Sequence, residues 1–223
     1  MIRLSASALA CRRGERLVFT GLDFSLTAGG ALLAVGANGS GKSSLLRLLA
    51  GLLPPFAGTI AWDGESIARD PHAHRLRVAY LGHADAVKSA LTVGEDIRFW
   101  TALEGGRPEA GSAALAAMGL ASLIDLSCRH LSAGQKRRLA LARVLARVEA
   151  PLWIVDEPTN GLDSQARQRL VRALAAHRDG GGIVIASSHE SLDLPGALVL
   201  DIGPFAVEAR SADVRGLEVD QLV

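Results

Sequence analysis

The stretch GANGSGKS at residues 36–43 decides the fold class of this chain. It fits the pattern G-x-x-x-x-G-K-[ST], in which glycines let the backbone curl so that successive N–H groups point at phosphate oxygens. The apolar run Ala31–Gly36 leads into it, and the helix-like stretch Ser44–Leu49 follows it. Because the N-terminus of a helix attracts anions, this strand–loop–helix order predicts a binding site for the phosphates of a nucleotide.

The loop supplies charge and a metal ligand as well as backbone donors. Lys42 is expected to reach the β- and γ-phosphates, and the Ser43 hydroxyl to take a place on Mg²⁺. The residues expected to bind the nucleotide here are Gly36, Ala37, Asn38, Gly39, Ser40, Gly41, Lys42, Ser43 and Ser44.

A second motif, LWIVDE at residues 152–157, is typical of a buried strand that ends in two carboxylates. Such a strand delivers Asp156 to its carboxyl end, where the ligands of open α/β sheets bind. Asp156 is therefore expected to hold Mg²⁺, directly or through water, and Glu157 to orient or deprotonate the attacking water. The alternative is that both acids only cap the turn before Pro158. The phosphate loop elsewhere in the chain favours the metal and catalytic roles.

The composition limits the class of protein further. Of the 223 residues, 49% are hydrophobic and only 4% aromatic, which suits one large domain of packed helices and parallel strands. The net charge of +1 argues against a strongly basic nucleic-acid-binding surface and against intrinsic disorder. The apolar runs fall short of the ~20 residues that span a bilayer. We therefore expect a cytosolic protein, or one that is peripheral on a membrane through a partner, with Cys11 and Cys128 as buried, reduced thiols.

Hydrophobic periodicity predicts alternating strands and helices, and hence an α/β fold with a mostly parallel sheet covered on both faces. The expected strands are Leu22–Thr27, Ala31–Gly36, Gly58–Gly64, Val78–Leu81, Leu152–Asp156, Ile183–Ser187, and two short ones near Leu198–Leu200 and Ala206–Ala209. The expected helical stretches are Ser44–Leu49, Leu91–Leu126 with a break at Gly105–Pro108, Lys136–Arg147 and Ser164–His177. Two capping boxes, Thr92 with Glu95 and Ser132 with Gln135, are expected to open helices.

The segment LSAGQKRR at residues 131–138 narrows the function to one family. Taken alone, Ser132 and Gln135 would only cap a helix. Placed shortly before the strand that ends in Asp156, the segment resembles the LSGGQ signature of the ABC ATPases, with Ala133 as a small departure. The resemblance implies that Ser132, Gly134 and Gln135 contact ATP bound to the opposite subunit, as a helix N-terminus directed at an anion.

Two further motifs follow in the order of that family. Asn160–Asp163 resembles the D-loop, and Ser188-His189 resembles the switch motif whose histidine touches the γ-phosphate. The resemblance spans residues 4 to about 200 and implies catalytic roles for Glu157 and His189. It implies the P-loop NTPase fold of an ABC nucleotide-binding domain with an antiparallel β edge. We expect this domain over residues 1–210, a small helical subdomain inserted at about 86–132, and a tail over 211–223.

One departure from the family pattern concerns adenine. The stretch CRRGER at residues 11–16 lacks the aromatic residue that usually stacks on the base. Arg12 or Arg13 is a candidate to stack its guanidinium plane there instead, and the alternative is a weak adenine contact with loose nucleotide choice.

A second departure lies in the segment GHADAVK at residues 82–88, where Ala84 stands at the position of an expected glutamine. In the family that glutamine lies near Mg²⁺ and the membrane partner. Either Asp85, His83 or a water completes the metal shell, or the contact is absent and hydrolysis is slower.

Within the family, the chain is similar to the ATP-binding subunits of haem exporters that act in cytochrome c maturation. The segments that carry this similarity are residues 9–19, 80–100, 131–145 and 150–163. It implies a homodimer of ATPase subunits that sandwiches two Mg²⁺-bound ATP molecules and joins integral membrane subunits. The chain would be peripheral on the cytoplasmic face of a bacterial inner membrane, touching the membrane through partners only and binding no nucleic acid.

The role implied by this similarity is ATP-driven release of a haem-loaded chaperone. The docking surface for the membrane subunits is expected on Leu91–Leu126 together with the loop His83–Ser89. Three alternatives stay open: the ATPase of another ABC exporter, a soluble ABC protein acting on DNA or ribosomes, and a small-molecule phosphotransferase.

Overall fold

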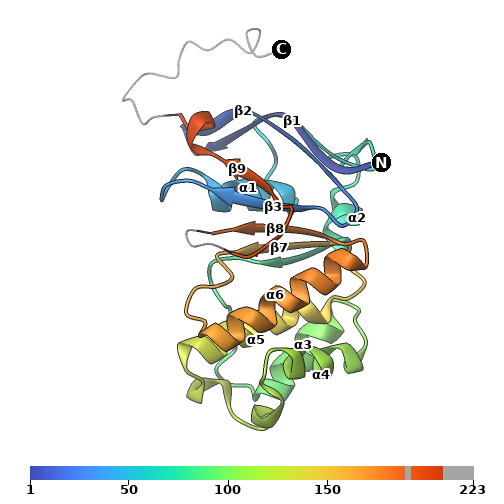
Figure 1. The fold of residues 1–223 in the computed structure, drawn as a ribbon, viewed down its shortest axis with the longest axis vertical. Helices are drawn as coiled ribbons and strands as arrows, with labels where there is room; N and C mark the ends of the chain where they lie inside the picture. Colours follow the sequence, from blue (N-terminus) through green and yellow to red (C-terminus); the bar gives the residue numbers. More distant parts are fainter. Residues whose placement is uncertain (189–191, 208–223) are drawn as a thin grey trace.

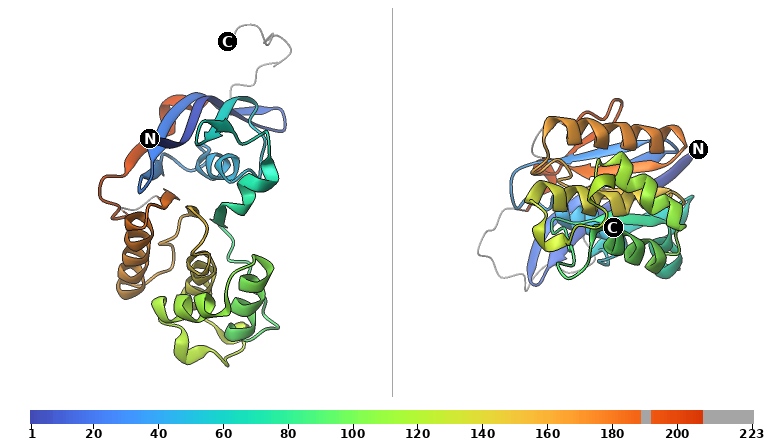
Figure 2. Two further views of the ribbon diagram at one scale, coloured as in Figure 1. Left: turned by 90° about the vertical axis from the view of Figure 1, so that its right-hand side faces the viewer. Right: turned by 90° about the horizontal axis from the view of Figure 1, so that it is seen from below.

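Two β-sheets and a group of helices are stacked along the long axis of the molecule (Figure 1). The computed structural model describes residues 1–188 and 192–207. A parallel sheet with strand order β6-β7-β8-β3-β9 lies in the middle, and an antiparallel sheet with order β2-β1-β4-β5 lies at one end. Helices α3 and α4 lie at the opposite end, as both side views show (Figures 1 and 2).

The strands of the parallel sheet are β3 (Ala31–Val35), β6 (Val78–Leu81), β7 (Leu152–Asp156), β8 (Ile183–Ser187) and β9 (Leu198–Asp201). Those of the antiparallel sheet are β1 (Ile2–Arg13), β2 (Arg16–Thr27), β4 (Ala57–Trp62) and β5 (Glu65–Ser66). The α-helices are α1 (Lys42–Leu49), α2 (Pro71–Leu76), α3 (Val93–Leu103), α4 (Pro108–Ala117), α5 (Ala133–Ala146) and α6 (Ser164–Asp179). Among the described residues, 3₁₀ turns cover Ala121–Leu123, Cys128–His130 and Gly203–Phe205.

Strand β7 shows why the parallel sheet forms from continuous apolar runs. All five of its residues are buried, because α1 covers one face of the sheet and α5 and α6 cover the other. Leu152 and Ile154 pack into the core shared with α1 and the antiparallel sheet, whereas Trp153 and Val155 pack into the core of the helical side. This double burial anchors the strand and places Asp156 at its carboxyl end.

The structure confirms the predicted parallel strands, with β6, β7 and β8 matching residue for residue. Strand β1 was not among the expected strands. Bulges interrupt its pairing with β2, and Ala8 has a positive φ of 48°, so the period-two alternation is broken. Helix α2 was also not expected, since its six residues are too few to show a helical period.

The expected strand over Ala206–Ala209 is wrong in its described part. The N–H of Gly203 donates to Asp201 Oδ1 at 2.8 Å, which turns the chain into a 3₁₀ helix that contains Pro204. Ala206 then forms only an isolated bridge to Phe19. Residues 208 and 209 lie outside the described residues.

Both predicted capping boxes are confirmed. Thr92 opens α3, and its Oγ1 accepts the N–H of Glu95 at 3.2 Å while Glu95 Oε2 accepts the N–H of Thr92 at 2.8 Å. Ser132 and Gln135 exchange the same pair of hydrogen bonds at the start of α5, at 3.2 and 2.8 Å. Helix α5 therefore begins at Ala133, three residues before the predicted start.

The predicted state of the two cysteines is confirmed as well. Cys11 and Cys128 are both buried free thiols, and burial raises the pKa of each. In the part of the chain that the structure describes, no helix has the length and apolarity needed to cross a bilayer.

Candidate nucleotide-binding and hydrolysis site

The loop between β3 and α1 leaves the parallel sheet at the edge toward which its strand arrows point (Figure 1). Gly41 ends the loop with φ +112°, a conformation that side-chain-bearing residues rarely adopt. A Cβ at this position would lie 2.7 Å from Val18 Cγ1 and 2.9 Å from Phe19 Cδ1. The loop thus curls tightly against β2, which is why glycine is required there.

Lys42 folds back across this loop. Its Nζ donates to the carbonyl oxygens of Gly36 at 2.8 Å and Ala37 at 3.0 Å. The side chain is almost fully buried, and burial lowers its pKa, while the nearby charges of Glu157 and Asp156 act in the opposite direction. The ammonium group therefore lies between the phosphate loop and the two carboxylates at the end of β7.

A pocket of about 340 Å³ opens beside the loop. Four of its lining side chains are cationic, which suits a polyphosphate, and Glu157 supplies a carboxylate to the same space. Its full lining is Arg13, Arg16, Val18, Asn38, Gly39, Gly41, Lys42, Ser43, Ser44, Arg47 and Glu157. The structure thus brings most predicted loop residues together with the predicted base. Of the two arginines considered for adenine stacking, Arg13 lines this pocket, while the guanidinium of Arg12 lies over the Phe56 ring, 4.5 Å from its centroid.

Asp156 is almost completely buried at the end of β7. Its Oδ1 accepts a 2.5 Å hydrogen bond from the hydroxyl of Ser187, at the end of the neighbouring strand β8. Its Oδ2 has no hydrogen-bond partner within residues 1–188 and 192–207. A buried carboxylate oxygen without a hydrogen-bond donor lowers the stability of the fold. It is also the kind of oxygen ligand that Mg²⁺ binds.

Glu157 has a left-handed backbone with φ +47°, which is strained for a residue with a side chain. The strain is held in place by hydrogen bonds: its N–H donates to Ser187 Oγ at 2.9 Å, and its Oε2 accepts from Asn160 Nδ2. The chain therefore turns sharply as it leaves β7, and the carboxylate of Glu157 reaches the pocket. The cap of the next helix is Asp163, whose Oδ1 accepts the N–H of Ala166 at 2.7 Å, so α6 does not need the two acids as caps.

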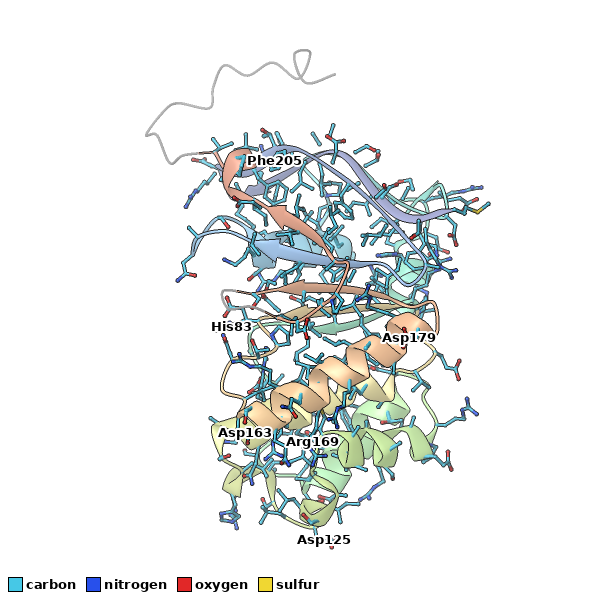
Figure 3. The ribbon with its side chains drawn as sticks, viewed as in Figure 1. His83, Asp125, Asp163, Arg169, Asp179 and Phe205 are labelled. Atoms are coloured by element: carbon cyan, nitrogen blue, oxygen red, sulfur yellow. The ribbon has the colours of Figure 1, made fainter. Side chains whose placement is uncertain are left out.

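The signature residues Ser132, Gly134 and Gln135 lie at the start of α5 and do not line this pocket. A Cβ on Gly134 would lie 2.8 Å from the carbonyl oxygen of Gly161, so this glycine allows α5 to approach the D-loop closely. His83 and Asp163 are labelled on one side of the molecule in Figure 3, the side on which β6 and β7 end. The signature, the D-loop and the phosphate loop therefore share one side of the molecule. The predicted switch residue His189 lies outside the described residues.

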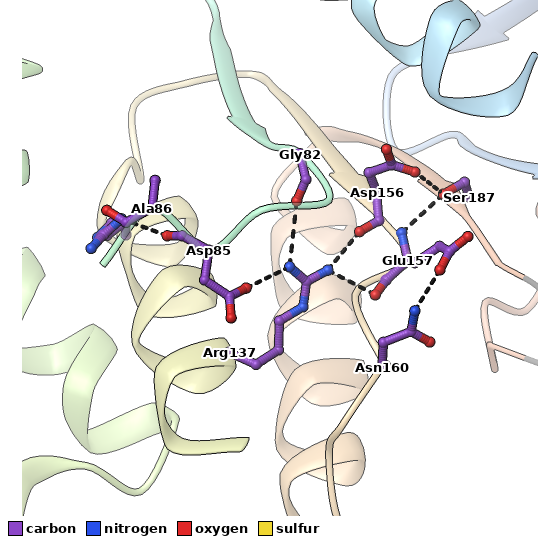
Figure 4. Close-up of polar contacts among 9 residues, drawn as sticks. Gly82, Asp85, Ala86, Arg137, Asp156, Glu157, Asn160 and Ser187 are labelled. Atoms are coloured by element: carbon purple, nitrogen blue, oxygen red, sulfur yellow. Dashed lines mark hydrogen bonds and ion pairs between the residues drawn. The ribbon is translucent and has the colours of Figure 1, made fainter. Parts of the chain in front are cut away.

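Arg137 was missed by the sequence analysis, and it is the polar centre of the region beyond β7 (Figure 4). Its guanidinium donates to Asp85 Oδ1 at 2.8 Å, to the carbonyl of Asp156 at 2.5 Å and to that of Glu157 at 2.7 Å. Only the helical period could have indicated its burial, because Leu141 and Val144 lie on the same buried face of α5. Asp85 is thus engaged by an arginine.

Comparison with known proteins places this chain in a family. Residues 19–160 match the family model of the ABC transporter. A putative ABC transporter ATP-binding protein from Pyrococcus furiosus superposes with a TM-score of 0.80 at 22% identity, covering 92% of this chain and 100% of that one. A bacterial Atm1-family ABC exporter with ATP bound gives a TM-score of 0.78 at 25% identity, over 91% of this chain and 38% of that one. Fold and site together are those of an ABC transporter ATP-binding subunit, an ATPase.

Among curated relatives, a protein of Paramagnetospirillum magneticum is 54% identical over 91% of this chain and 95% of its own length. A protein of Rhodospirillum rubrum is 50% identical over 92% and 87%, and one of Rhizobium meliloti is 44% identical over 92% and 99%. All three are named cytochrome c biogenesis ATP-binding export protein CcmA. This chain belongs to their family.

Proposed function

We propose that this chain is the ATP-hydrolysing subunit of a haem export complex that serves cytochrome c maturation, where it drives release of a haem-loaded chaperone. The observation that carries the proposal is the single pocket in which Lys42, Ser43 and Glu157 meet. That pocket provides a phosphate-binding loop, a metal ligand and a base. The names of the relatives support the assignment to cytochrome c biogenesis and export.

The residues present also fit a magnesium ion. Asp156 Oδ2 is buried without a donor, and the Ser43 hydroxyl lines the pocket. These are hard oxygen ligands of the kind that Mg²⁺ binds together with nucleotide phosphates. We assign Asp156 and Ser43 to the metal, which would neutralise charge on the β- and γ-phosphates when bound.

Hydrolysis then uses groups of this chain. Lys42 and the backbone donors of the loop hold the phosphates. Glu157 accepts a proton from a water molecule while the oxygen of that water attacks the γ-phosphorus. The bond from that phosphorus to the bridging oxygen breaks, giving ADP and phosphate. His189 is assigned a contact with the γ-phosphate by its place after β8.

A second copy of the chain would complete each site. Ser132, Gly134 and Gln135 lie outside the pocket of their own chain and on the same side of the molecule, which supports their contact with ATP held by the opposite copy. The capping box occupies the backbone N–H groups of Ser132 and Gln135, so the start of α5 would offer those of Ala133 and Gly134 to the γ-phosphate.

We assign the integral membrane subunits to a groove of about 510 Å³ between the parallel sheet and the helical segment. His83, Trp100 and Arg143 line it, and Phe99 and Leu103 of α3 are exposed next to it. We treat residues 86–132 as the helical subdomain of a 1–210 ABC domain. Docking here would hold the chain on the cytoplasmic face of the inner membrane through partners only.

The test is to purify the tagged chain with its membrane subunits in mild detergent and to measure phosphate release. Lys42→Ala and Glu157→Gln should each abolish release, and Glu157→Gln should retain bound ATP. In cells, both variants should lose haem-stained c-type cytochromes. Full cytochrome maturation with either variant would overturn the proposal. Other multispanning partners would indicate another exporter, and no membrane partner would indicate a soluble ABC protein.

A further inference from the structure

We propose that Arg137 is a positioning residue for Glu157. It holds the backbone of Glu157 in place and couples that position to the loop after β6. The inference rests on the proposed function, since Glu157 must be the base for its position to matter. Arg137 does not itself line the nucleotide pocket but bonds to the backbone of Glu157, which does, so it acts through Glu157 and not on the nucleotide.

The contacts of Arg137 fix both peptide groups that flank Glu157. One nitrogen, Nη2, donates to the carbonyl of Asp156 at 2.5 Å and to the carbonyl of Glu157 at 2.7 Å. These two peptide planes define the left-handed turn by which Glu157 leaves β7. A planar guanidinium is suited to hold two neighbouring acceptors at once, because its donors have a fixed geometry.

The other nitrogen of the guanidinium reaches the loop after β6. Nη1 donates to Asp85 Oδ1 at 2.8 Å and to the carbonyl of Gly82 at 3.4 Å. The side chain of Arg137 is only 6% exposed, against 28% for Asp85. A cation buried to this degree needs its counter-charge, and Asp85 is the one carboxylate paired with it among the described residues. Movement of Asp85 would therefore disturb the group that holds Glu157.

The same loop lines the groove assigned to the membrane subunits. Arg143, further along α5, donates to the carbonyls of Asp85 at 3.0 Å and Ala86 at 3.3 Å, and it is itself paired with the fully buried Asp96. Helix α5 thus holds this loop at two points, one of which also holds Glu157. This gives a physical connection from groove to base in a chain with Ala84 at the glutamine position.

The experiment compares Arg137→Gln, Asp85→Asn and the double variant in the purified membrane complex. Each single change should lower kcat for ATP about 10- to 100-fold, the range expected when a reacting group is misplaced by about 1 Å. The KM for ATP should stay within about twofold, because the phosphate contacts are untouched. The double variant should be about as slow as Arg137→Gln alone, since both changes break one connection.

Arg138→Gln is the matched control. Arg138 is the neighbour of Arg137 on α5 and also bonds carbonyls, those of Met118 at 3.2 Å and Gly119 at 3.4 Å, but these lie in the helical segment. Its kcat should stay within about twofold of wild type. Arg137→Lys keeps the charge without the planar fork, and it should remain at least about fivefold slow.

The outcomes separate the two proposals. If Lys42→Ala and Glu157→Gln abolish hydrolysis but Arg137→Gln keeps wild-type kcat, the positioning role is wrong and the proposed function stands. A loss of kcat matched by a rise in KM, or by an equal loss in Arg138→Gln, would also overturn it as a structural effect. If Glu157→Gln itself keeps full activity, the proposed function is refuted, and with it the basis for a positioning role of Arg137. Melting temperatures above the assay temperature are required of every variant.

Discussion

Ser187→Ala should destabilise the protein more than the loss of a single hydroxyl suggests. The hydroxyl is fully buried, donates to Asp156 Oδ1 at 2.5 Å and accepts the N–H of Glu157 at 2.9 Å. Its removal takes a donor from a buried carboxylate and the acceptor from a backbone N–H. Each such loss costs about 1–3 kcal/mol, and more for a charged group, so we expect a loss of about 2–5 kcal/mol in the free energy of unfolding.

The assay is urea unfolding followed by fluorescence, with and without nucleotide and Mg²⁺. Because Asp156 is assigned to the metal, Mg²⁺ with ATP should reduce the difference between Ser187→Ala and wild type. Ser25→Ala, at an exposed position on β2, is the control and should change stability by less than about 0.5 kcal/mol. A change below about 0.5 kcal/mol for Ser187→Ala without nucleotide would refute the claim that its hydroxyl satisfies two buried groups.

Three further predictions concern other parts of the molecule. Gly134→Ala places a Cβ 2.8 Å from a D-loop carbonyl oxygen and should lower the ATPase rate of the membrane complex at least about tenfold; a normal rate would contradict the close approach. Asp96→Asn leaves the buried Arg143 without its counter-charge and should cost about 3–5 kcal/mol in urea unfolding, so a loss under about 1 kcal/mol would count against a buried ion pair. Burial lowers the pKa of His177 to about 4 in the folded state. As the pH falls, His177 is therefore protonated in the unfolded chain before it is protonated in the folded one. Its contribution to stability is therefore complete above about pH 6.5 and is lost as the pH falls toward 4. His177→Phe should flatten the melting temperature as a function of pH between about 4 and 6.5. An unchanged slope would show that His177 does not contribute to this pH dependence.

The parallel strands and the helix starts could be predicted because their causes are local. An apolar run such as Ile183–Ser187 is buried on both faces, and a capping box such as Ser132 with Gln135 is satisfied within four residues. Strand β1 escaped prediction because its bulges break the alternation that a strand is recognised by. Its other edge pairs with β4, which lies far along the chain.

The candidate site divides in the same way. The phosphate loop and the two acids at the end of β7 could be proposed from the sequence because each belongs to one short segment. The partners of those acids were not found, since Ser187 and Arg137 reach them from β8 and α5 and only the fold brings them close. A buried arginine whose partners lie in the loop after β6 and at the end of β7 leaves little local trace in the sequence beyond its position on the buried face of a helix.

The short distance between two functional regions of helix α5 would couple the two ATP sites of a dimer. The first turn of this helix carries the signature and its second turn carries Arg137, so a rigid segment only about 8 Å long joins the two. In a dimer, the first turn would contact the ATP bound to the opposite copy. The second turn, through Arg137, would position Glu157 of its own copy. Occupancy of one site would thereby tune the chemistry of the other, and turnover would rise with ATP concentration more steeply than for two independent sites.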